Sequence, residues 1–274
     1  MIKLKTFGSF TVGNGLTSVQ EGAWRSEKLE KLFVYLAMNR NRGVCIEDIS
    51  EAIWQVEEET DNPVGALKNL AYRLRKALRD ASFGEECIVS VRGGLYKWND
   101  DVEVTIDVEE FDRYINEAEM AFCRSKETAI ESYEKAIALY HGDFLPLRTD
   151  THWFMTLNAF YHSRYVNTVK ALAELYIDTG CYEKLEQLCT KAVVYERSDE
   201  QIYSYLILAR MRTKKVQMAF DTYETAKAIM DKDLGVRKTV MLNKVYEELL
   251  SVTKGASSYN IDEVKDDISE ESMN

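Results

Sequence analysis

The first third of the chain switches between strand-like and helix-like spacing of its apolar residues. Residues 2–13 (IKLKTFGSFTVG) alternate apolar and polar side chains in two short runs around Gly8, which predicts a β-hairpin or meander. Residues 26–38 return to helical spacing, with Ser26 as the expected N-cap. Residues 46–54 repeat that spacing over a shorter length. The pattern predicts a strand pair followed by two helices.

A third helix is predicted over residues 62–78. Asn62 can cap its N-terminus. Pro63 suits the first helical position, because the N–H that proline lacks would have no hydrogen-bond partner within the helix there. The apolar residues keep helical spacing through Leu67, Leu70, Leu74 and Leu78. After Gly84, residues 87–98 (CIVSVRGGLYKW) form two β-rich runs joined through Gly93 and Gly94, which predicts a hairpin.

From Asp107 to about residue 253 the spacing is helical, with almost no strand signal. Asp107 and Glu110 match a capping box. An internal repeat has an offset of 34 residues, the period of tetratricopeptide (TPR) repeats. It pairs Gly180, Tyr182, Cys189 and Ala192 with Lys214, Val216, Tyr223 and Ala226. A third match at Ala129, Tyr133 and Ala136 lies off this register, so a longer helix over about 152–178 is expected between them.

Charge is distributed unevenly along the chain. The formal net charge is -11, yet residues 1–100 contain 14 Lys and Arg and 14 Asp and Glu, so residues 101–274 carry the whole excess. Within the neutral part, residues 66–79 (ALKNLAYRLRKALR) hold five basic side chains and no acidic one. On a helix taken alone, such a face is usually a solvated surface. It is also typical of a helix that contacts DNA phosphates and bases.

Several classes of protein find no support in the sequence. No apolar run is long enough to cross a bilayer, and the N-terminus lacks the pattern of a secretory signal. The five cysteines are scattered without a CxxC pair, which fits a reducing cytoplasm rather than a disulfide or zinc framework. Common nucleotide-binding, hydrolase and metalloprotease motifs are missing, and His141, His152 and His162 are not spaced as ligands. We therefore expect no enzyme activity and no cofactor.

The order of the predicted elements resembles a known family. Residues 44–54, 62–78 and 88–98 resemble the OmpR-type winged helix-turn-helix, and a preceding strand pair is typical of the SARP family of bacterial transcriptional activators. Residues 107–253 resemble the bacterial transcriptional activator domain, including segments 141–154 and 231–250. The expected fold is an α+β winged helix-turn-helix domain (1–100) followed by an all-α TPR-like helical repeat domain (107–253). An acidic tail (254–274) is expected to be disordered.

The resemblance assigns DNA contacts to the third helix and to the tip of the hairpin. The expected DNA-binding residues are Lys68, Asn69, Tyr72, Arg73, Lys76, Arg79 and Arg92. Arg75 and Arg79 lie near the border of the apolar stripe, where backbone contacts or intramolecular pairs are expected. Arg25 and Lys28 are weaker phosphate candidates. Trp54 and Trp98 are interpreted as core residues. Cys45 stands where the family usually has a Ser or Thr N-cap, so a weak cap is expected there.

The sequence thus favours a cytoplasmic, sequence-specific DNA-binding transcription regulator, expected to be an activator. The resemblance implies binding to direct repeats in double-stranded DNA as a side-by-side pair, and recruitment of RNA polymerase holoenzyme. The alternative is a TPR-type interaction adaptor whose winged domain does not bind DNA. An adaptor would have no reason to keep residues 66–79 free of acids. A membrane partner is not expected.

Overall fold

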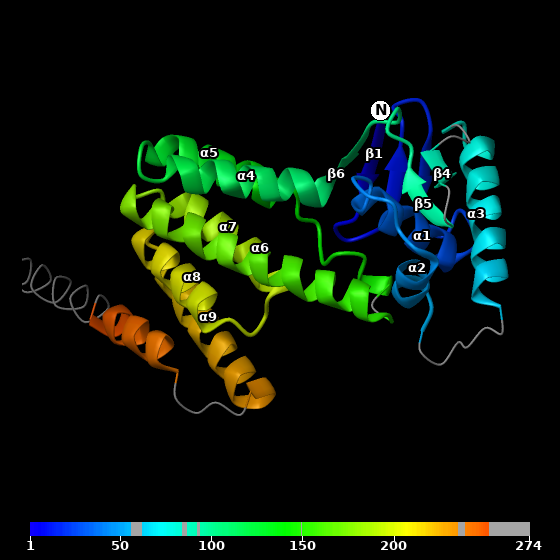
Figure 1. The fold of residues 1–274 in the computed structure, drawn as a ribbon. Coiled ribbons are helices and arrows are strands. Elements are labelled where there is room, and N and C mark those ends of the chain that lie inside the picture. The colour runs from blue at the N-terminus through cyan, green and yellow to red at the C-terminus, as the bar shows by residue number, and fades with distance from the viewer. Residues whose placement is uncertain (56–61, 84–86, 92–93, 149, 235–238, 252–274) are drawn as a thin grey trace, which may run out of the picture. The chain divides into compact units, whose positions relative to one another are not determined.

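The computed structural model describes residues 1–55, 62–83, 87–91, 94–148, 150–234 and 239–251. The chain divides into two compact units, residues 1–165 and residues 166–274 (Figure 1). The predicted tail at 254–274 lies outside the described residues.

A small sheet opens the first unit. Its order is β3-β2-β1-β6, with β1 Ile2–Lys5, β2 Thr11–Gly13, β3 Ser18–Gln20 and β6 Val104–Ile106. β1 pairs with β2 antiparallel, which confirms the predicted hairpin, and with β6 parallel. The two edge strands were not predicted. Each has only three residues, too few to show alternation in the sequence.

Three helices and a second strand pair follow the hairpin. They are α1 Glu27–Met38, α2 Ile46–Ile53, α3 Pro63–Asp80, β4 Ile88–Val91 and β5 Leu95–Trp98. All five were predicted within two residues. Ser26 takes the N-cap position of α1, but its side chain accepts no capping hydrogen bond. Trp98 is buried as expected, whereas Trp54 is only partly buried. The interpretation of Trp54 as a core residue is therefore wrong.

The rest of the first unit is helical. It contains α4 Asp107–Ala121, α5 Lys126–Leu139, a 3-10 turn at Pro146–Arg148, and the start of α6 His152–Asp178, whose bounds match the predicted long helix. The predicted capping box at Asp107 is wrong, because Ile106 takes the N-cap position and Asp107 is the first helical residue. Its carboxylate accepts hydrogen bonds from the backbone N–H groups of Thr6 (2.7 Å) and Phe7 (3.0 Å). Asp107 thus ties the end of β1 to α4.

Helix α1 is buried nearly all round, from Leu29 to Ala37, including two charged residues. Glu30 is 2% exposed and pairs with Arg148, and Lys31 pairs with Asp150. These ion pairs join α1 to the segment that leads into α6. A buried charge is costly unless it is paired, so these contacts fix that segment against α1.

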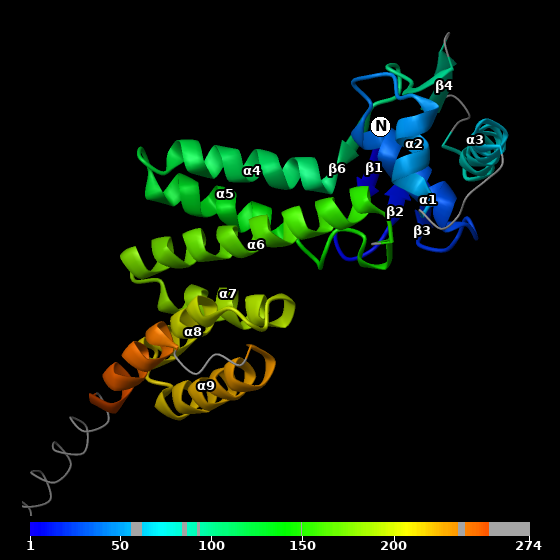
Figure 2. The same cartoon turned by 60° about the horizontal axis from the view of Figure 1, so that its bottom comes forward.

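In the second unit the helices pack in series (Figure 2). They are α7 Tyr182–Tyr195, α8 Glu200–Arg212 and α9 Val216–Ile229, followed by a π-helical turn and a helix over 240–251. Apolar residues of α8, α9 and 240–251 share one core, in which Ala219, Tyr223 and Ala226 are buried. The small residues predicted from the repeat therefore lie where the helices approach.

The 34-residue repeat is reproduced in the backbone. The N–H of Cys181 donates to the carbonyl of Tyr176 (2.8 Å), and 34 residues later Lys215 donates to Arg210 (2.8 Å). Gly180 and Lys214, which precede these donors, both adopt a left-handed conformation, with φ of 69° and 60°. Both α6 and α8 therefore end in the same way, in a turn that favours glycine.

The left-handed conformation at Lys214 costs conformational free energy, because lysine has a Cβ and glycine does not. We expect Lys214→Gly to raise the free energy of unfolding by about 0.5–1 kcal/mol. The matched variant Gly180→Ala should lower it by a similar amount, and since no atom lies within 4 Å of the added Cβ, the effect would come from the backbone alone. Urea unfolding followed by circular dichroism measures both. A destabilising Lys214→Gly would contradict this account of the turn.

Candidate nucleic-acid interface

Helix α3 begins at a well-formed N-terminal cap. The side-chain oxygen of Asn62 accepts from the backbone N–H of Gly65 (2.8 Å), and Pro63 occupies the first turn. A Cβ at Gly65 would lie 2.7 Å from the Asn62 side chain, so glycine leaves room for the cap. The cap predicted from Asn62 and Pro63 is confirmed, and it fixes the start of the helix beside α2.

The two faces of α3 differ sharply. The stripe Leu67, Leu70, Ala71, Leu74 and Leu78 is buried in the packing against α1 and α2. The side chains exposed on the other face are Lys68, Asn69, Tyr72, Arg73, Lys76 and Arg79. Tyr72 is 66% exposed. α3 lies at the edge of the first unit (Figures 1 and 2). The six expected contact residues of α3 thus form one surface, which we call the α3 face.

Three of the cations on the α3 face are not neutralised locally. Within the described part of the chain, Lys68, Arg73 and Lys76 have no ion-pair partner. The single acidic residue of α3 is Asp80, at its last position. Arg75 differs, because its Nε donates to the carbonyl of Ile88 (3.1 Å) and so ties α3 to β4. Arg75 therefore has the intramolecular role that was one of its two predicted alternatives.

The β4–β5 hairpin is fixed to the start of α2. Val44 and Tyr96 exchange both backbone hydrogen bonds, at 2.8 and 2.9 Å. Gly43 allows this approach, because a Cβ there would lie 3.1 Å from Leu95. Gly94 has φ of 81°, as a tight turn requires. Arg92, the candidate at the hairpin tip, lies outside the described residues.

A hollow lies beside the first half of the α3 face. It has a volume of about 430 Å³ and is lined by Lys28 of α1, by Trp54 just after α2, and by residues of α3 that include Asn69 and Arg73. The Lys28 ammonium lies 6.0 Å from the centre of the Trp54 ring. Sequence reasoning missed that Trp54 is only partly buried and lines this hollow. The available signal was its position at the end of a short amphipathic helix. Lys28, one of the two weaker phosphate candidates, lines the same hollow as Arg73. Arg25, the other weaker candidate, lies just before α1 and has a φ of 49°.

The start of α2 carries the weak cap expected from Cys45. Its sulfur accepts from the backbone N–H of Asp48 at 3.4 Å. Burial raises the pKa of another thiol, Cys87, to about 11, so that thiol stays protonated near neutral pH.

Within the described residues, no group of three His, Cys, Asp or Glu could hold a metal ion. The described helices also include none that is long and apolar enough to span a membrane.

Two known proteins are similar to this chain over most of its length. The chain is 23% identical over 238 residues to the transcriptional regulator RedD of Streptomyces coelicolor, covering 86% of this chain and 67% of RedD. It also resembles the solved structure of Mycobacterium tuberculosis EmbR in complex with a low affinity phosphopeptide, with a TM-score of 0.68 at 19% identity. That match covers 95% of this chain and 70% of EmbR, and at this identity it shows a shared fold.

A family model gives the most specific result. The bacterial transcriptional activator domain matches residues 106–250, from the end of β6 to the last described helix. This match covers more than half of the chain and includes the TPR-like helices. The chain belongs to the family of proteins with a bacterial transcriptional activator domain, the helical domain of SARP-type transcriptional regulators.

Proposed function

We propose that the protein is a sequence-specific DNA-binding transcription regulator. Helices α1 to α3 and the β4–β5 hairpin act as a winged helix-turn-helix within residues 1–100, with α3 in the major groove. Arg73, Lys76, Lys68 and Asn69 reach base edges or phosphates, Tyr72 contacts the backbone, and Arg79 binds a phosphate. Arg92 is the candidate contact of the wing.

The α3 face carries this proposal. Its side chains match the chemistry of DNA: Arg and Lys bind the acceptors of guanine, Asn binds adenine, and any cation binds phosphate. The buried leucine stripe holds the helix rigidly, so these groups project from a fixed backbone. An adaptor that binds only proteins would not need a face of α3 that is cationic and free of acids.

The helical half has a different role in this proposal. Residues 101–274 carry the whole net charge of -11, so DNA phosphates repel them. Residues 107–253 therefore contact protein, either a second copy bound side by side on a direct repeat or RNA polymerase holoenzyme. The regulator acts in the cytoplasm and needs no cofactor.

Selection from a random DNA library tests the proposal. Double-stranded fragments retained by the full-length protein should converge on one motif, present as two direct repeats. Binding of the selected fragment should weaken steeply with salt, because Lys and Arg release counterions from each phosphate that they contact. Enrichment of no motif, or affinity equal to that for random DNA at every salt concentration, would reject sequence-specific binding.

A further inference from the structure

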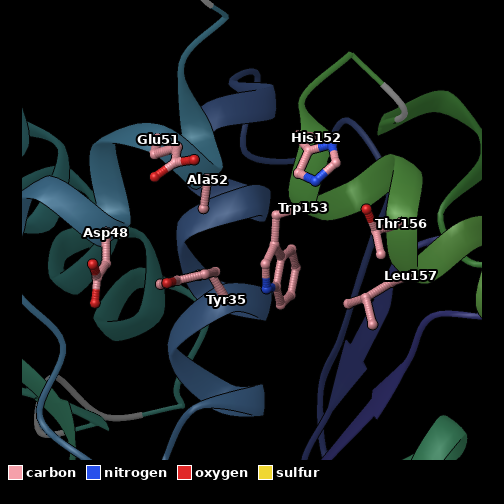
Figure 3. A pocket seen from close by; sticks show the side chains of 8 residues that line it. All are labelled: Tyr35, Asp48, Glu51, Ala52, His152, Trp153, Thr156 and Leu157. Atoms are coloured by element: carbon pink, nitrogen blue, oxygen red, sulfur yellow. The ribbon is translucent and has the colours of Figure 1, made fainter.

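A pocket of about 350 Å³ opens inside the first unit, and none of its lining residues belongs to α3 (Figure 3). Its walls come from α1, α2 and the first turns of α6. The lining residues are Tyr35, Asp48, Glu51, Ala52, His152, Trp153, Thr156 and Leu157. The volume is at the lower end of the range for small-molecule sites in proteins.

The two walls of this pocket are held at a fixed separation. The hydroxyl of Thr151, just before α6, donates to the carbonyl of Ala52 in α2 (2.8 Å). Gln55, just after α2, donates to the carboxylate of Asp150 (2.7 Å). The Tyr35 and Trp153 rings pack edge to face with centroids 4.9 Å apart. Contacts from three elements thus form the pocket before any ligand arrives.

The pocket is negatively charged. Asp48 and Glu51 lie three residues apart on α2, which places both on one side of the helix, and the lining contains no Lys or Arg. Asp48 has one exposed ion pair with Arg42 at 4.0 Å, which contributes little. Within the described residues Glu51 has no ion-pair partner. A ligand with a positive charge would be attracted here.

The aromatic side chains add two further features. The face of an indole ring attracts cations, and Trp153 lies between the α2 carboxylates and the α6 residues His152 and Thr156 (Figure 3). Tyr35 is 4% exposed, yet its hydroxyl donates to no described residue. Burial, and next the Asp48 carboxylate, raise the pKa of this hydroxyl, so it remains a hydrogen-bond donor at neutral pH.

We propose that this pocket binds a small organic cation, with an ammonium or guanidinium group between Asp48 and Glu51 and an apolar body against Trp153. The ligand would contact both α2, which packs against α3, and α6. It would therefore be an effector that joins the DNA-contacting helices to the start of the transcriptional activator domain's long helix. Neutral or anionic molecules of the same size would lack the attraction that the two carboxylates provide.

Benzylamine and benzyl alcohol, titrated into the full-length protein at pH 7, test the proposal. They match in size, and benzylamine carries the positive charge. NMR spectroscopy follows the indole N–H signal of Trp153, assigned with Trp153→Phe, and the amides of α2. Benzylamine should shift these signals to saturation, and benzyl alcohol should bind at least about fivefold more weakly, because an ion pair at a partly exposed site contributes modestly.

Two variants on α2 locate the interaction. Glu51→Gln should weaken benzylamine binding about fivefold or more, whereas Glu47→Gln removes the same charge from an exposed position outside the pocket and should leave the affinity unchanged. Both positions are exposed, so folding should be intact in each. Equal binding of the two probes, equal loss in the two variants, or no shift of the Trp153 signal would each overturn the proposal.

Discussion

Replacing Arg148 by Met is expected to lower the free energy of unfolding of the first unit by about 3–5 kcal/mol. The guanidinium of Arg148 pairs with Glu30, and at 3.2 Å with Glu21. Glu30 is 2% exposed and Arg148 is 8% exposed. Without Arg148, the Glu30 carboxylate would remain buried with one backbone N–H, that of Gly22, as a partner (2.8 Å). An uncompensated buried charge is among the most destabilising changes that one substitution can make.

Tryptophan fluorescence in urea measures this effect selectively. All four tryptophans lie within residues 1–165, so their signal reports on the first unit alone. Arg113→Met is the control, because it removes an exposed ion pair with Glu117 and should cost less than about 1 kcal/mol. The double variant Glu30→Gln/Arg148→Met should recover much of the loss. If Arg148→Met and Arg113→Met were equally stable, the ion pair would have no part in joining α1 to the segment before α6.

The sequence predicts best those features that local physics decides. Asn62 and Pro63 start α3 because capping depends on neighbouring residues, and the leucine stripe of α3 is buried because its spacing follows the helical period. The offset of 34 residues also has a local origin, since the turns at Gly180 and Lys214 repeat the same hydrogen bonds. The surface placement of the six α3 residues follows directly from that stripe.

Features that depend on distant partners were not predicted. The carboxylate of Asp107 accepts hydrogen bonds from Thr6, about one hundred residues earlier, as well as from the N–H of Val108 in its own helix. Glu30 and Lys31 occupy the face of α1 that an amphipathic pattern would leave in solvent. Arg148, Asp150 and Phe154 contact these two side chains instead. One signal was present in the sequence. The run LFVYLA at 32–37 is apolar all round, which is typical of a helix buried on both sides.

This burial determines how far an N-terminal fragment must extend to keep the contacts of α1. A fragment ending near residue 105 would lack Asp107, Arg148 and Asp150. It would expose the second buried side of α1 and remove the hydrogen bonds that hold Thr6 and Phe7. A fragment that extends to residue 165 keeps all of these contacts, so it is the better choice for separating DNA binding from the function of the second unit.

The second large effect concerns DNA affinity. Arg73→Ala/Lys76→Ala removes two cations from the centre of the α3 face, and each contact is worth about 1–3 kcal/mol if it reaches a base. We expect the double variant to lose at least about thirtyfold in affinity for the selected operator. Both residues are exposed, and neither has an ion-pair partner within the described residues, so the fold should be unaffected.

The most direct test of the α3 face compares this variant with one of equal charge. Arg113→Ala/Lys135→Ala removes two exposed cations from α4 and α5 and changes the net charge identically. Fluorescence anisotropy with the selected operator, at several salt concentrations, should show a large loss and a smaller salt slope for Arg73→Ala/Lys76→Ala. The control should bind within about threefold of the unmodified protein, because salt screens charges far from the DNA. Equal losses in the two variants, or unchanged binding by Arg73→Ala/Lys76→Ala, would contradict the assignment of DNA recognition to α3.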